Sequence, residues 1–281
     1  MPYTTLVSTD LLAEHLDDPD WVVVDCRYDL KVLDWGFAEY QRAHVPGAVF
    51  ADLLKDLSSP PSPDTGRHPL PAPEQFVARA SSWGIASGKQ VIVYDHTVGA
   101  FAARLWWTLR YYGHMAVALL DGGFPKWLRE GRPSRSGVES RVPARFEGQP
   151  HAAEAVEAAE VERIRLDPGH RLVDARTATR YRGEQEPLDP VAGHIPGAVN
   201  RFHEANVGPD GTFPPPEVLK EQFAALPGGA PPEQAVVYCG SGVTSAHHLV
   251  AMERAGLPGA RLYVGSWSEW IRDEKRERAK G

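Results

Sequence analysis

The stretch AVVYCGSGVTS, from Ala235 to Ser245, decides the fold class. Its first four residues form a short apolar run, typical of a strand buried on both faces. The glycines after Cys239 predict a tight turn, and the spacing of residues 246–255 predicts a helix directly after it. A strand, a glycine-rich turn and a helix in this order are typical of a mostly parallel α/β sheet, in which functional sites lie at the carboxyl ends of the strands.

Cys239 stands at such a strand end. The turn lets backbone N–H groups point inward as an anion-binding nest, and the following helix directs its positive N-terminus to the same place. An ordinary thiol has a pKa of about 8.5, and a loop of this kind favours the thiolate without a basic side chain. The alternative is a buried structural cysteine in an inert turn. The expected nest consists of the backbone of Gly240, Ser241, Gly242, Val243 and Thr244.

Two copies of one pattern run through the chain, and an internal repeat fixes the number of domains. In each copy, short Val/Ile-rich runs alternate with segments of helical spacing. The repeat therefore predicts an α/β protein of two tandem domains, each a mostly parallel sheet covered by helices on both faces. The matching segments are 21–27 with 171–176, 44–49 with 194–199, 91–95 with 236–239, and 121–124 with 264–267.

The two copies differ at the cysteine position. Asp95 in the first copy stands where the second has Cys239, so only the second copy can supply a nucleophilic sulfur. A connector rich in Gly, Pro, Ser and Arg, residues 130–150, separates the copies. We place the boundary within it, which gives a catalytically silent domain at 1–141 and a catalytic domain at 142–281.

A Pro-rich stretch lies inside the first copy, at residues 58–73. We expect it to form a long surface loop that covers part of an active-site cleft, because long loops in compact domains commonly carry function. The alternative is a tolerated insertion without function.

Composition narrows the class of partner. The 281 residues include 30 Lys and Arg against 37 Asp and Glu, a formal net charge of −7. This balance argues against a nucleic-acid or anionic-membrane surface and favours a small molecule. The two cysteines, Cys26 and Cys239, show no Cys/His ligand spacing, so neither a disulfide nor a metal site is expected. No apolar stretch approaches the roughly 20 residues that span a bilayer, and we expect a cytoplasmic protein.

Three motifs together resemble the tandem-rhodanese sulfurtransferases: the loop at 236–244, the two His-(Val/Ile)-Pro-Gly-Ala segments, and residues 265–270. The similarity covers nearly the whole chain. It implies two rhodanese domains, the first of them silent, and a cysteine that carries a persulfide. The sulfur would pass from a small anionic donor to a thiophilic acceptor such as cyanide or a thiol. The resemblance implies no cofactor and no metal, and a thioredoxin-like reductant is a further candidate partner.

Within this family, the uncharged loop CGSGVT at 239–244 looks like the 3-mercaptopyruvate branch, whereas thiosulfate enzymes usually carry basic residues directly after the cysteine. A thiosulfate dianion gains from cations in the loop, while a monocarboxylate with a leaving enolate needs an anion clamp and a proton source. The favoured donor is therefore 3-mercaptopyruvate, and thiosulfate is the alternative.

The resemblance assigns Cys239 as the nucleophile. Ser241 and Thr244 carry hydroxyls that are expected to join the chemistry, although helix capping would also explain such residues after a turn. His44 corresponds to the histidine of a proton relay, with Asp34 as the carboxylate that orients it. Alternatively, His44 only fixes a turn that both copies of the repeat share.

The resemblance also implies two arginines that hold the donor anion. Arg180 matches the first, because a guanidinium can grip a carboxylate through paired hydrogen bonds. The second has no clear counterpart, since the segment 184–189 is acidic and shortened. Arg182 is the candidate substitute.

Two other classes of function use similar loops. A cysteine phosphatase closes its nest with an arginine that grips the phosphate, and no arginine occurs in residues 240–250. A non-enzymatic sulfur carrier or sensor would bind a partner protein without turnover. Assays with an aryl phosphate and with a sulfur donor distinguish these classes from a sulfurtransferase.

Overall fold

Each half of the sequence forms its own five-stranded parallel sheet in the computed structural model, which describes residues 1–281. The first sheet has the order β1-β5-β4-β2-β3 and the second the order β6-β10-β9-β7-β8. Corresponding strands therefore occupy corresponding places, which confirms the tandem α/β repeat. The strands of the first sheet are Leu6–Val7 (β1), Trp21–Asp25 (β2), Val49–Phe50 (β3), Gln90–Tyr94 (β4) and Val117–Leu120 (β5). Those of the second are Ala155–Val156 (β6), Arg171–Asp174 (β7), Val199–Asn200 (β8), Ala235–Tyr238 (β9) and Arg261–Tyr263 (β10).

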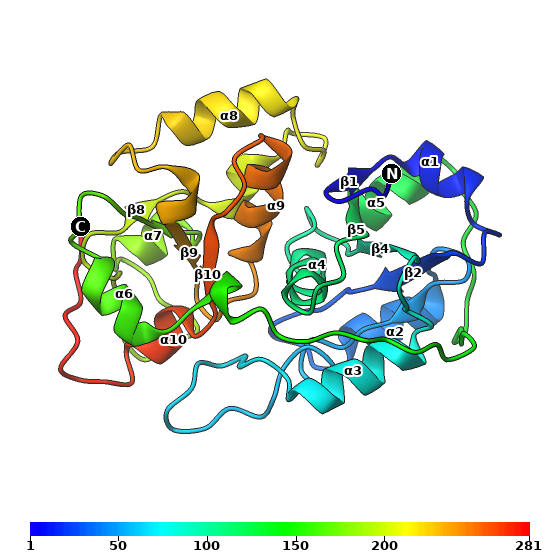
Figure 1. Ribbon diagram of the computed structural model, residues 1–281, viewed down its shortest axis with the longest axis horizontal. Coiled ribbons are helices and arrows are strands. Elements are labelled where there is room, and N and C mark those ends of the chain that lie inside the picture. Colours follow the sequence, from blue (N-terminus) through cyan, green and yellow to red (C-terminus); the bar gives the residue numbers. More distant parts are fainter. The chain divides into compact units, whose positions relative to one another are not determined.

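Helices connect the strands in both halves (Figure 1). In the first half these are Thr9–Glu14 (α1), Trp35–Arg42 (α2), Pro73–Ser82 (α3), Ala102–Tyr111 (α4) and Gly123–Arg129 (α5). In the second they are Ala158–Ile164 (α6), Ala178–Tyr181 (α7), Pro216–Ala224 (α8), Ala246–Arg254 (α9) and Ser266–Trp270 (α10), with 3₁₀ turns at Ala152–Glu154, His203–Asn206 and Pro232–Gln234. None of the helices combines the length and the apolar character needed to cross a membrane.

The central strands are covered on both faces. All five residues of β2 and of β4 are buried, and so are all four residues of β9. Because side chains alternate between the two faces of a strand, continuous burial requires helices on both sides of the sheet. The apolar runs that predicted these strands are therefore explained by their central positions.

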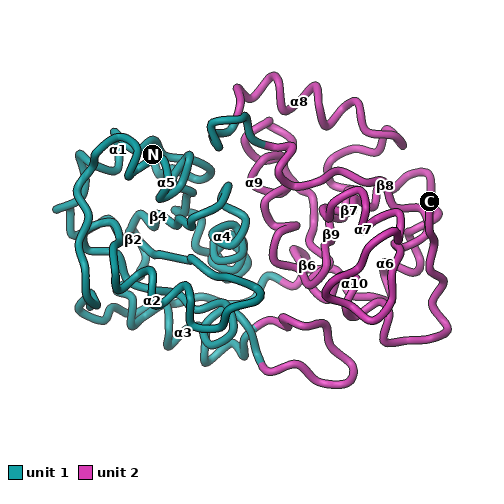
Figure 2. Tube along the Cα trace, turned by 180° about the vertical axis from the view of Figure 1, so that it is seen from behind, with its two compact units in different colours: residues 1–59, 71–151, 207–213 teal, residues 60–70, 152–206, 214–281 magenta.

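The chain forms two compact units (Figure 2). The first unit consists of residues 1–59, 71–151 and 207–213, and the second of residues 60–70, 152–206 and 214–281. Part of the Pro-rich stretch thus belongs to the unit that contains Cys239. The domain boundary after residue 141 stays a prediction.

A buried ion pair recurs at the same place in each unit. Arg27 Nη2 lies 2.6 Å from Asp25 Oδ2, and Arg176 Nη2 lies 2.6 Å from Asp174 Oδ2. Each arginine also donates to the backbone carbonyl just before a His-(Val/Ile)-Pro-Gly-Ala segment, Ala43 in the first unit and Gly193 in the second. These pairs fix the turn after α2 and its counterpart in the second unit.

Candidate active site

Cys239 directly follows β9, the central strand of the second sheet, and its side chain is buried. Its backbone is tied to the start of α10, since its N–H donates to Ser266 Oγ (3.1 Å) and its carbonyl accepts from Trp267 N (3.1 Å). Gly242 has a φ of +73°, and a Cβ there would clash with the carbonyl oxygen of Val264. Only glycine fits this position without strain. The glycine-rich turn therefore holds the cysteine at the carboxyl end of the sheet.

The surroundings of the Cys239 sulfur favour the thiolate. Burial by itself raises the pKa of this thiol, but hydrogen bonds from the hydroxyls of Ser245 and Thr244 and from the backbone N–H groups of Ser241 and Ser245 outweigh it, and the pKa is lowered. Ser245 stands at the N-cap of α9 without a side-chain capping bond, and its buried Oγ bonds to no nitrogen or oxygen of the protein. That hydroxyl is therefore available to the sulfur, and helix capping does not explain it.

The first unit shows the same type of loop around the side chain of an aspartate. Asp95 follows β4 as Cys239 follows β9, and its carboxylate is fully buried. The carboxylate accepts hydrogen bonds of 2.7–3.1 Å from four backbone N–H groups, those of Thr97, Gly99, Phe101 and Ala102. The loop of the silent half is thus an anion cradle that the protein fills with its own side chain.

Cys26 has the opposite environment. Burial, followed by the negative charges of Asp25, Asp95 and Asp56, raises the pKa of this thiol well above its ordinary value. A protonated buried thiol is a poor nucleophile. The two cysteines are therefore distinguished by the donors around Cys239 and the carboxylates around Cys26.

The second side chain of the site is His68, which the sequence interpretation did not single out. Its Nδ1 lies 2.8 Å from Ser241 Oγ, and both side chains are buried. The neighbouring backbone is anchored to the start of α10, because Arg67 N donates to Ser268 Oγ (3.0 Å) and a Cβ at Gly66 would lie 2.5 Å from a carbonyl oxygen of that turn. His68 is the only histidine in the Pro-rich stretch 58–73. A single histidine in a loop expected to cover the active site was the one sequence feature that could have identified it.

Arg180 lies beside the cysteine loop, as expected of a donor clamp. A Cβ built on Gly240 would stand 3.3 Å from its Nη2 and 3.5 Å from its Nη1. The other edge of the guanidinium is held by Glu186, with Nε and Nη2 at 2.6–3.1 Å from the carboxylate, and Nη2 also lies 3.3 Å from Asp189 Oδ2. The acidic segment 184–189 thus positions Arg180.

His44, the predicted relay histidine, belongs to the first unit. The ring is completely buried in the first unit, where Nδ1 bonds to the carbonyl of Tyr40 (2.7 Å) and the imidazole stacks on the phenol ring. His194 in the second unit bonds to the carbonyl of Tyr181 (2.8 Å) and stacks in the same way. This shared arrangement supports the alternative that both histidines fix a turn.

Asp34 and Arg182 also lie apart from their expected partners. Asp34 is exposed and pairs with Lys55 (3.2 Å), so it does not orient His44. Arg182 is exposed and pairs with Glu184 (2.6 Å), so it does not join Arg180 beside the cysteine loop. Arg182 follows Arg180 by two residues at the end of a short helix, so its side chain points in a different direction from that of Arg180. Proximity in sequence was therefore a poor guide to its position.

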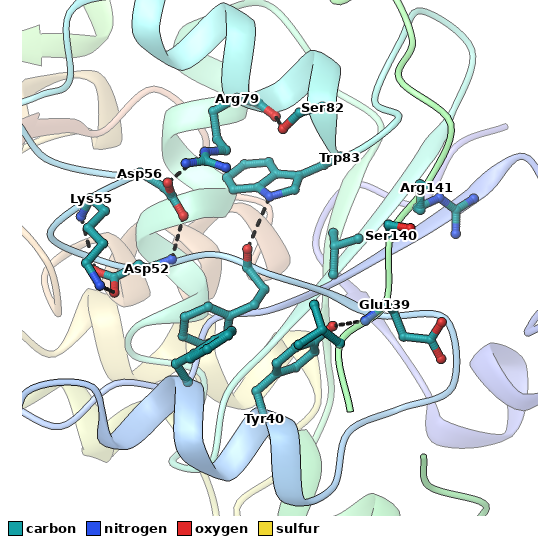
Figure 3. A pocket seen from close by; sticks show the side chains of 14 residues that line it. Tyr40, Asp52, Lys55, Asp56, Arg79, Ser82, Trp83, Glu139, Ser140 and Arg141 are labelled. Atoms are coloured by element: carbon teal, nitrogen blue, oxygen red, sulfur yellow. Dashed lines mark hydrogen bonds and ion pairs between the residues drawn. The ribbon is translucent and has the colours of Figure 1, made fainter. Parts of the chain in front are cut away.

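A cavity of about 340 Å³ lies in the first unit between α2, α3 and residues 138–141 (Figure 3). It contains none of the predicted site residues, and two of its polar side chains are engaged within the unit. Arg79 pairs with Asp56 (2.7 Å), and Trp83 Nε1 donates to the Phe50 carbonyl (3.1 Å). The protein has no group of three or more His, Cys, Asp or Glu side chains arranged to hold a metal ion.

Comparison with known proteins agrees with this geometry. The profile of the Rhodanese-like domain matches residues 8–130 and 157–273. The chain is 47% identical to the "Probable 3-mercaptopyruvate sulfurtransferase" of Pseudomonas aeruginosa over 100% of both chains. It is 36% identical to the "Putative thiosulfate sulfurtransferase SseB" of Mycobacterium tuberculosis over 92% of this chain and 90% of the relative. The crystal structure of the 3-mercaptopyruvate sulfurtransferase SseA from Escherichia coli superimposes with a TM-score of 0.82 at 34% identity, covering 95% of this chain and 100% of that one. The chain therefore belongs to the rhodanese-like domain family and is a sulfurtransferase with two tandem rhodanese domains.

Proposed function

We propose that this sulfurtransferase takes its sulfur from 3-mercaptopyruvate and passes it to a thiol or to cyanide through a persulfide on Cys239. The observation that carries the proposal is the buried Cys239 sulfur, whose pKa is lowered by hydroxyl and backbone donors, with the Arg180 guanidinium beside its loop. A thiolate is the attacking form of cysteine, and a guanidinium is suited to a carboxylate.

In the first step the Cys239 thiolate attacks the sulfur of 3-mercaptopyruvate. A sulfur–sulfur bond forms and the carbon–sulfur bond of the donor breaks, so the electron pair of that bond leaves as the enolate of pyruvate. The enolate takes up one proton and becomes pyruvate, and the sulfur remains on Cys239 as a persulfide. The donors that favour the thiolate also suit the negatively charged persulfide.

Ser241 and His68 supply the proton route. Their 2.8 Å hydrogen bond joins the loop that follows the cysteine to an imidazole, the side chain best suited to move protons near neutral pH. In this proposal the pair delivers a proton to the departing enolate. Thr244 stabilises the sulfur through its hydroxyl.

In the second step the acceptor attacks the outer sulfur of the persulfide. Cyanide leaves as thiocyanate and a thiol leaves as its own persulfide, and in both cases the Cys239 thiolate is regenerated. A thioredoxin-like reductant fits the same step, because its thiolate can attack the outer sulfur. The chemistry requires a reduced cysteine, which favours a cytoplasmic location.

The proposal is tested by steady-state kinetics with cyanide as acceptor, comparing 3-mercaptopyruvate with thiosulfate and using Cys239→Ser as the blank. We expect a higher kcat/KM for 3-mercaptopyruvate, since the loop after Cys239 carries no basic side chain to balance a dianion. Faster turnover of thiosulfate would overturn the donor assignment. Sulfur transfer by Cys239→Ser would overturn the nucleophile, and hydrolysis of an aryl phosphate would point to a phosphatase.

A further inference from the structure

A second guanidinium lies over the cysteine loop. A Cβ built on Gly240 would stand 2.9 Å from Nη2 of Arg67, closer than the 3.3 Å to Nη2 of Arg180. Arg67 lies in the segment 60–70 of the second unit, which is remote in sequence from Arg180. Two cations from distant segments therefore meet on the same side of the residue that follows the nucleophile.

Asp189 holds the two arginines together. Its Oδ1 pairs with Nη1 of Arg67, and its Oδ2 lies 3.3 Å from Nη2 of Arg180. The side chain of Asp189 is only 3% exposed, whereas that of Arg67 is 27% exposed. Nη2 of Arg67 and Nη1 of Arg180 make no hydrogen bond to the protein, so each guanidinium keeps donors for a bound anion.

We propose that Arg67 supplies the second cation of the donor site, so that Arg67 and Arg180 together bind the carboxylate of 3-mercaptopyruvate. The inference rests on the proposed function. The acidic segment 184–189, which lacks a second arginine of its own, instead provides the carboxylate that draws in an arginine from elsewhere in the chain.

The identity of residue 240 agrees with this arrangement. A side chain there would occupy the space in front of both guanidinium groups, because its Cβ would lie 2.9 Å from Arg67 Nη2, closer than van der Waals contact. Glycine keeps that space open for a ligand next to Cys239. The segment 66–68 therefore brings an anion-binding arginine and, one residue later, the imidazole that bonds to Ser241.

The test is single-turnover loading of Cys239 with sulfur from 3-mercaptopyruvate, followed by mass spectrometry, in Arg67→Gln and Arg67→Lys. Gln removes the charge but can still bond to Asp189, so the segment stays attached. We expect Arg67→Gln to raise the half-saturating donor concentration about tenfold or more, because the donor carboxylate loses a hydrogen bond to a charged group. The maximal loading rate should stay within about twofold of that of the unaltered protein. Arg67→Lys should fall between Arg67→Gln and the unaltered protein.

Two controls separate anion binding from a structural role. Arg163→Ala removes an exposed arginine of α6 and should leave loading unchanged. His68→Ala is the contrasting variant, because loss of the proton route should lower the maximal rate rather than the apparent affinity. An unaltered half-saturating concentration in Arg67→Gln, or a loss confined to the maximal rate, would overturn the role of Arg67. If the unaltered protein takes no sulfur from 3-mercaptopyruvate, the proposed function itself fails, and this inference fails with it.

Discussion

Replacing Ser245 with alanine tests how the protein ionises Cys239. The Ser245 hydroxyl is fully buried and bonds to no nitrogen or oxygen of the protein, so its contribution is directed at the sulfur. A hydrogen bond to a charged group contributes about 1.5–3 kcal/mol, and a tenfold change in an ionisation constant corresponds to about 1.4 kcal/mol. Ser245→Ala should therefore raise the pKa of Cys239 by about 1–2.

The assay is the rate of alkylation by iodoacetamide as a function of pH, read from the mass of the peptide that contains Cys239. Only the thiolate reacts, so the rate rises as pH increases through the pKa, and a raised pKa moves the whole profile to higher pH. At pH values below both pKa values, the variant should react roughly 10- to 100-fold more slowly than the unaltered protein. Cys26 serves as an internal reference, because burial and nearby carboxylates keep the pKa of its thiol well above the ordinary value.

Ser82→Ala is the matched control, since it removes a serine hydroxyl in the first unit that donates to the Arg79 carbonyl. Its Cys239 profile should coincide with that of the unaltered protein. Stability should change little in Ser245→Ala, because no nitrogen or oxygen loses a partner. A coincident profile for Ser245→Ala would refute the reasoning, since the hydroxyl would then not contribute to the thiolate.

Substitutions at three further positions probe the two loops and a buried histidine. Asp95→Ala should destabilise the first unit by about 3–5 kcal/mol, because four buried N–H groups lose their acceptor, and Asp95→Asn should cost less; chemical denaturation measures both. Gly242→Ala should cost at least about 1–2 kcal/mol from its positive φ alone and should abolish sulfur loading, which denaturation and mass spectrometry record. Burial lowers the pKa of His248 well below its ordinary value, so the folded state resists the proton that the unfolded state accepts. Stability should thus fall as the pH drops below about 6.5, and His248→Gln, followed by thermal denaturation against pH, should flatten that dependence.

The fold could be predicted because its signals are local and repeated. Apolar runs such as 91–94 and 236–238 have the length and composition of central strands, and the order of matching segments in the two halves fixed the topology. The cysteine loop was equally visible, since Gly242 and Cys239 stand in the same short stretch. The turn that Gly242 and Cys239 form depends mainly on residues near them in sequence, so a short stretch was enough to predict it.

The rest of the site depends on contacts between distant segments. His68 and Ser241 are separated by 173 positions, and Arg67 and Asp189 by 122. Spacing along the chain cannot indicate such pairs, because a Pro-rich loop carries no periodicity that fixes where its side chains point. The assignment of His44 followed a motif that the structure places in a turn, where the buried ring bonds to the carbonyl of Tyr40.

Exposure of the protein to 3-mercaptopyruvate without an acceptor, followed by peptide mass spectrometry, tests the central claim most directly. The account predicts a gain of one sulfur atom on the peptide that contains Cys239, none on the peptide that contains Cys26, and release of the added sulfur as thiocyanate when cyanide is supplied. No added sulfur on the Cys239 peptide, or equal labelling of both cysteines, would contradict it.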